Sequence, residues 1–175
     1  IPSLRGAKVE MVGGNQGTAR VGETGSILRF FAELGITVAE GDPKRITFHE
    51  LDLSILAVPD MATLPSLDPD PAAKHNILLM HWEIEGIIPR SASELNRRPM
   101  GITERELGAE RWDYVALGHY HVYREVAPNA FYSGSLDYTS TNSWGERTEE
   151  RATIWPELGQ DGEEGIGGKG IIEHD

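Results

Sequence analysis

Short runs of apolar residues recur along the chain, and most of them end at glycine, proline or histidine. The clearest runs cover residues 53–58, 76–80 and 114–117, which stop at a proline, a histidine and a glycine respectively. Apolar runs of four to eight residues that end at such turn signals are typical of buried strands. A further run at 8–12, which leads into two glycines, predicts another strand near the start of the chain.

Two segments have the pattern of helices instead. Apolar residues fall at helical spacing between 23 and 34, and Gly35 follows as a stop signal. Thr103 and Glu106 have the spacing of a capping box and predict a short helix over 103–110. The remaining expected strands cover 36–39, 45–51, 124–127, 130–132 and 171–173, of which 124–127 and 130–132 form a hairpin.

The order of these elements predicts an α/β fold, with α+β as the alternative. Proline-rich and polar segments at 64–73 and 91–99 are expected to be loops, and the glycine-rich segment 159–170 is expected to be a flexible loop. Neither an internal repeat nor a domain boundary is evident, so residues 1–175 are expected to form a single domain.

Composition narrows the functional classes. The formal net charge of −12 argues against non-specific nucleic-acid binding, which depends on lysine and arginine. The chain lacks cysteine, so a metal site has to use histidine, aspartate, glutamate or asparagine, and a reducing, cytoplasmic location is expected. No apolar stretch is long enough to span a bilayer, so no membrane association is expected.

Histidines follow two of the expected strands. His119 and His121 lie just after the strand at 114–117, and His81 ends the strand at 76–80. If the two strands are parallel neighbours, the three imidazoles converge at one edge of the sheet, where they suit zinc, manganese or iron. Each of them is otherwise an ordinary surface or core histidine, and Asn15, which follows the first strand, is otherwise a turn residue.

The segment from Asp113 to His121 resembles the last metal-binding motif of the calcineurin-like metallophosphoesterases. The segment from Ala130 to Leu136 resembles the part that follows it in the SbcD-like DNA repair exonuclease branch of that superfamily. Met80-His81 with Glu85-Gly86 resembles the middle histidine motif, and Val12 to Asn15 resembles the asparagine motif. The resemblance covers most of the chain and corresponds to the C-terminal half of the phosphoesterase domain.

This resemblance implies a layered β-sandwich flanked by helices, and a site with two metal ions. Asn15, His81 and His119 would bind one ion, and His121 would bind the other. Manganese is the expected metal, with zinc and iron as alternatives. The implied activity is hydrolysis of a phosphoester, in which paired ions activate water and stabilise charge on the phosphoryl group.

The chain departs from the family pattern at two points. Gln16 and Gly17 stand where the family has the histidine and aspartate of its Asn-His-Asp motif, so the expected general acid is missing. The 14 residues before Asn15 contain neither aspartate nor histidine, although the family's first two motifs lie upstream of the asparagine. The expected di-metal site is therefore incomplete in this chain, and the domain itself is expected to be incomplete.

Two functional hypotheses follow. The first is a metal-dependent phosphodiesterase or nuclease that acts on DNA or on a small phosphodiester, with its other ligands outside this sequence. The second is a degenerate or truncated module of the same fold that binds a metal or a partner without turnover. Neither the substrate nor the oligomeric state follows from the sequence.

Overall fold

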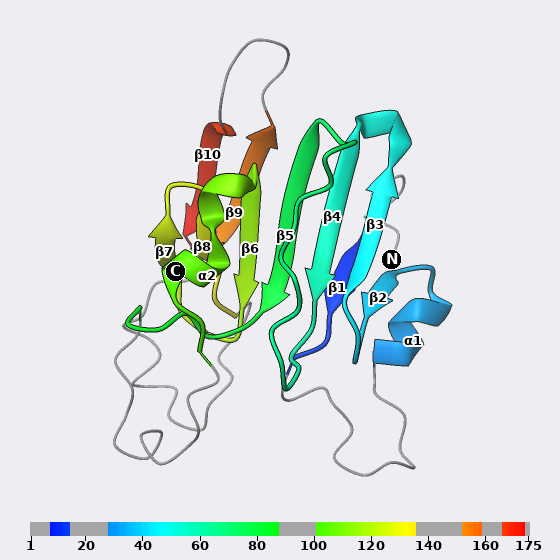
Figure 1. Cartoon of the computed structure of the whole chain (residues 1–175), viewed down its shortest axis with the longest axis horizontal. Helices are drawn as coiled ribbons and strands as arrows, with labels where there is room; N and C mark the ends of the chain where they lie inside the picture. Colours follow the sequence, from blue (N-terminus) through cyan, green and yellow to red (C-terminus); the bar gives the residue numbers. More distant parts are fainter. Residues whose placement is uncertain (1–7, 15–27, 88–100, 136–151, 159–165, 174–175) are drawn as a thin grey trace.

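A computed structural model describes residues 8–14, 28–87 and 101–135, together with the backbone of 152–158 and 166–173 (Figure 1). The predicted loop at 91–99 and the first part of the predicted helix at 23–34 lie outside this part of the chain. Within it, the fold is mixed α/β, with one large sheet, two small ones and few helices. No helix of the described residues is long and apolar enough to cross a membrane.

The central sheet has six strands in the order β3-β4-β5-β6-β8-β7. Strands β4, β5, β6 and β8 run parallel to one another, and the two edge strands run antiparallel to their neighbours. The bounds of the six strands are Lys44–Phe48 (β3), Leu53–Val58 (β4), His75–His81 (β5), Tyr114–Gly118 (β6), Arg124–Ala127 (β7) and Ala130–Tyr132 (β8). The predicted strands at 53–58, 76–80 and 114–117 and the predicted hairpin are confirmed.

Two further sheets have two strands each. Strands β1 (Glu10–Val12) and β2 (Thr37–Ala39) pair in parallel, and β1 contacts β4 and β5 of the central sheet. Strands β9 (Ala152–Leu158) and β10 (Ile166–Glu173) form an antiparallel pair. Strand β9 was not predicted, and β10 begins five residues before its predicted start, inside the expected glycine-rich loop.

The helices are short. Helix α1 covers Leu28–Glu33, and Gly35 after it has a φ of 81°, as expected of a glycine that ends a helix. Helix α2 covers Glu104–Leu107 and begins with the predicted capping box, in which the Thr103 hydroxyl accepts a hydrogen bond from the Glu106 N–H.

Two further predicted boundaries are wrong. The helix predicted over 103–110 stops at Leu107, because Gly108 turns into the left-handed region with a φ of 57° and the short 3-10 helix η3 (Ala109–Arg111) follows. The strand predicted over 45–51 stops at Phe48, because the 3-10 helix η2 (His49–Leu51) takes its last three residues. In both cases a left-handed residue, Gly108 or Asp52, ends the turn.

The main core lies on one face of the central sheet. Strand β5 alternates buried and partly exposed residues, so that Leu78 and Met80 face the core. The strand register aligns Leu78 with Val115 and Met80 with Leu117 on β6. Helix α2 and the segments next to it cover this face with the buried side chains of Leu67, Ile84, Ile102, Leu107, Ala109 and Trp112. His81 follows the opposite alternation and therefore lies on the other face of the sheet.

Candidate metal centre

The candidate site lies where β5 and β6 end. His81 is the last residue of β5 and pairs in register with Gly118, the last residue of β6. Because the two strands are parallel neighbours, their carboxyl ends meet at one edge of the sheet. The sequence-based expectation that these two strand ends would bring histidines together is therefore confirmed for His81 and His119.

The rings of His81 and His119 are in direct contact. Their centroids lie 5.5 Å apart, and their planes are perpendicular. Two imidazoles that bind one ion at nitrogen–metal distances of about 2.1 Å have centroids no more than about 6.5 Å apart. The observed separation lies within this limit, so the distance between the rings allows a shared ion.

His119 has an unusual backbone conformation. Its φ is 116°, and among the described residues only Asp52 is another non-glycine residue with a positive φ. Such conformations cost of the order of 1–3 kcal/mol and tend to accumulate at functional sites. The turn at the end of β6 thus places the imidazole of His119 against that of His81 on a strained backbone.

Two glycines allow the chain to approach His81 closely. A Cβ atom at Gly14 would lie 2.5–2.9 Å from three atoms of the His81 ring, and one at Gly118 would lie 3.0 Å from its Nδ1. Any larger residue at Gly14 would displace the imidazole. The sequence predicts that Gly14 lies in a glycine turn, within the segment that resembles the asparagine motif, whereas the structure shows it packed against a candidate ligand.

The protonation state of His81 suits metal binding. Burial, followed by the nearby His119 and His121, lowers the pKa of His81 to about 4. The imidazole is therefore neutral at pH 7, and neutral imidazole is the form that binds metals.

His121 is held through its backbone. Its carbonyl oxygen accepts hydrogen bonds from the N–H of Ser135 at 3.2 Å and from the Ser135 hydroxyl at 3.4 Å. Gly134 between the two serines has a φ of 85°, and a Cβ there would lie 3.0 Å from the same carbonyl oxygen. The segment Ser133-Gly134-Ser135 therefore fixes the main chain of His121.

An aromatic group supports the site from the core side. The ring of Tyr120 lies between His119 and Tyr132, with centroids 5.0 and 4.9 Å away. Tyr132 is fully buried, donates a hydrogen bond to the Trp82 carbonyl and accepts one from the Ile84 N–H. It therefore anchors the chain that follows His81, a role that its sequence position alone does not reveal.

The other predicted ligands have different outcomes. Asn15, Gln16 and Gly17 lie outside the described residues, so the placement of the asparagine stays a prediction. Asp113 lies at the end of the sheet opposite to His81 and His119, just before β6 begins. Its carboxylate accepts a hydrogen bond from the Asn76 N–H. Within the described part of the chain, no group of three or more His, Asp or Glu side chains is arranged to hold a metal ion.

Comparison of the chain with protein-family models and with curated proteins gave no match.

Proposed function

We propose that this chain carries part of the site of a metal-dependent phosphoester hydrolase, with His81 and His119 as metal ligands. The observation that carries the proposal is the contact between the two imidazoles at the carboxyl ends of neighbouring parallel strands. The strained backbone of His119 and the lowered pKa of His81 support the same reading. His121 and Asn15 are the further proposed ligands.

The donor set defines which ions fit. Neutral imidazoles suit manganese, zinc and iron, and manganese is the expected ion by family resemblance. When bound, such ions polarise a phosphoryl oxygen and activate water. The role of His81 and His119 is to hold the ion with neutral nitrogen donors, and the role of Gly14 and Gly118 is to leave room for the His81 ring.

The proposed activity is slow. Gln16 stands at the position of the family's general acid, and a neutral amide does not donate a proton to a leaving oxygen. General acid catalysis typically contributes about 10²–10⁴-fold, so we expect hydrolysis to be slower than in a complete family member by at least that range.

The test combines metal binding with turnover in the 175-residue chain. Manganese binding is measured by calorimetry, and hydrolysis is followed with bis-p-nitrophenyl phosphate as the probe. We expect His81→Ala and His119→Ala each to weaken manganese binding more than about tenfold, since each removes a side chain proposed to bind the ion directly. His49→Ala is the matched control, because His49 is exposed on η2 and is expected to leave binding unchanged.

The outcomes separate the two hypotheses. Manganese-dependent hydrolysis that disappears in His119→Ala supports the hydrolase. Manganese binding that depends on both histidines without any turnover supports the non-catalytic metal-binding module instead. Binding that is equal in the wild type, His81→Ala and His119→Ala contradicts the proposed metal centre itself.

A further inference from the structure

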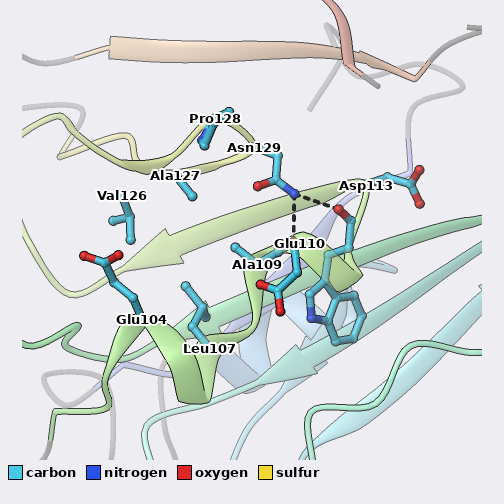
Figure 2. A pocket seen from close by; sticks show the side chains of 10 residues that line it. Glu104, Leu107, Ala109, Glu110, Asp113, Val126, Ala127, Pro128 and Asn129 are labelled. Carbon is cyan, nitrogen blue, oxygen red and sulfur yellow. Dashed lines mark hydrogen bonds between the residues drawn. The ribbon is translucent and has the colours of Figure 1, made fainter. Parts of the chain in front are cut away.

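A second feature lies at the opposite end of the central sheet. A groove of about 720 Å³ opens between α2, η3 and the turn that joins β7 to β8 (Figure 2). Its apolar lining consists of Leu107, Ala109, Trp112, Val126, Ala127 and Pro128. The groove lies beside the beginnings of β6 and β8, whereas the histidines lie where β5 and β6 end. It is therefore separate from the candidate metal centre.

The groove combines this apolar floor with an acidic border. Glu104, Glu110 and Asp113 line it, and among the residues that the structure describes neither lysine nor arginine does. Within the described part of the chain, Glu104 and Glu110 take part in no ion pair, and the nearby Arg111 is directed to Asp68 at 3.5 Å. The border therefore favours a cation, and the floor favours an apolar group beside it.

The groove also adjoins an edge of the sheet. Strand β7 contributes Val126 and Ala127 and is the last strand of the sheet order, so among the described residues it pairs only with β8. A bulge between Glu125 and Ala127 interrupts that pairing. An edge strand is a place where an extended peptide can lie alongside a sheet.

We propose that this groove binds an extended segment of a partner protein in which lysine or arginine flanks an apolar side chain. The apolar side chain lies on the floor near the half-buried Val126 and Ala127. The cations face Glu104 and Glu110, and the peptide main chain lies alongside β7. Charge complementarity distinguishes this partner from a neutral or an acidic peptide.

The test uses synthetic peptides and the 175-residue chain. Fluorescence anisotropy measures binding of fluorescein-labelled Lys-Val-Lys-Leu-Lys, with Gln-Val-Gln-Leu-Gln as the uncharged probe. We expect the basic peptide to bind about tenfold more tightly at low salt. The double variant Glu104→Gln with Glu110→Gln should weaken it roughly fourfold, because each exposed charge contact is worth about a factor of two.

The matched control is the pair Glu33→Gln with Glu50→Gln. Both glutamates are exposed, and they lie on α1 and η2, away from the groove. The control makes the same change in net charge and is expected to leave peptide binding unchanged. Equal weakening by the two double variants would show attraction to the overall negative charge and would overturn the proposal.

A second variant tests the groove directly. Val126→Lys places a cation beside the acidic border and should abolish binding of the basic peptide, with the fold checked by near-UV circular dichroism. Equal affinity for the basic and the uncharged peptides would contradict the proposal. So would a concentration-dependent dimer in sedimentation that Val126→Lys dissociates, because the occupant would then be a second copy of this chain.

Discussion

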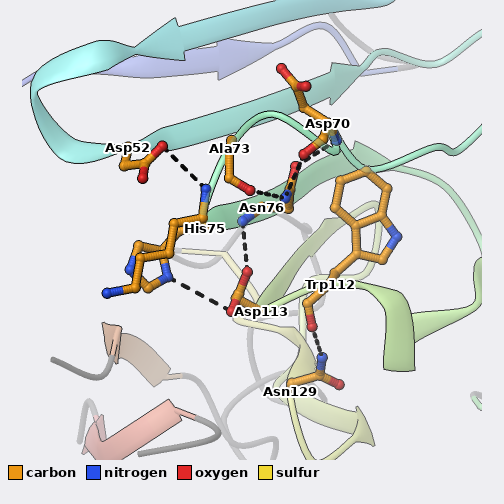
Figure 3. A network of polar contacts seen from close by, with 9 residues as sticks. Asp52, Asp70, Ala73, His75, Asn76, Trp112, Asp113 and Asn129 are labelled. Carbon is orange, nitrogen blue, oxygen red and sulfur yellow. Dashed lines mark hydrogen bonds and ion pairs between the residues drawn. The ribbon is translucent and has the colours of Figure 1, made fainter. Parts of the chain in front are cut away.

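The two ends of the parallel strands are built differently. At the amino ends of β5 and β6, polar side chains and backbone groups form a hydrogen-bonded network around Asn76 (Figure 3). At the carboxyl ends, the rings of His81 and His119 lie against each other beside closely packed glycines, and the backbone of His119 is strained. Hydrogen bonds therefore stabilise the sheet at one end, whereas backbone strain lowers its stability at the other.

The network at the amino end explains how the strands begin in register. The Asn76 side chain accepts a hydrogen bond from the Asp70 N–H at 2.7 Å and donates to the carbonyls of Asp70 and Ala73. Asp113 accepts from the Asn76 N–H at 2.6 Å and thereby joins β5 to the start of β6. A similar role falls to Asn129, whose amide donates to the carbonyls of Ala109 and Trp112.

The largest expected effect comes from Asn76→Ala. Asn76 is only 8% exposed, and its removal leaves one N–H and two carbonyls of the preceding loop without their partner. Because each unsatisfied buried group costs about 1–3 kcal/mol, the free energy of unfolding should fall by roughly 3 kcal/mol. Urea denaturation measures the loss. A change below about 1 kcal/mol would show that the network does not stabilise this end.

A smaller effect is expected at the carboxyl end, where the proposed metal-binding role of His119 and the stability of its backbone oppose each other. Glycine tolerates the φ of 116° at position 119, but alanine does not. His119→Gly should therefore be more stable to urea than His119→Ala by about 1 kcal/mol, although both lose the proposed metal ligand. Equal stability of the two variants would mean that the turn relaxes without strain.

An effect of similar size concerns two buried tryptophans, one at each end of the parallel strands, and here the amino end has the unsatisfied group. The indole N–H of Trp82 donates to the Pro59 carbonyl at 3.1 Å, whereas that of Trp112 has no acceptor among the described residues. Trp82→Phe should therefore lower the unfolding free energy by about 1 kcal/mol more than Trp112→Phe. Thermal unfolding compares the two, and a greater loss in Trp112→Phe would contradict this assignment.

The sequence pattern was sufficient for the buried parts of the central sheet. Apolar runs that end at proline, histidine or glycine placed β4, β5 and β6 within a residue or two, and the Thr103–Glu106 spacing gave the start of α2. These features depend on local composition, which a single sequence contains. The pairing of His81 with His119 followed from the strand ends and needed only that the strands be parallel neighbours.

Other features depend on contacts that composition does not encode. The close packing of Gly14 on His81 and the hydrogen bonds of Tyr132 join residues far apart in the chain. Strand β9 contains a proline and was missed, because proline argues against an internal strand, whereas β9 pairs only with β10 in the described part of the chain. The end of α2 was misplaced because the left-handed Gly108 stops the helix, and the end of β3 because η2 begins at His49.

The parallel arrangement of β4, β5, β6 and β8 also has a consequence for how the protein folds. Parallel neighbours are joined by long connections, so His81 and His119 meet only after distant parts of the chain have paired. Pairing of this kind is slow, because closing a long loop costs conformational entropy before the stabilising contacts between the strands can form. The contact between the two histidine rings therefore forms late in folding. An ion that required both rings as ligands would bind only to chains in which β5 and β6 have already paired.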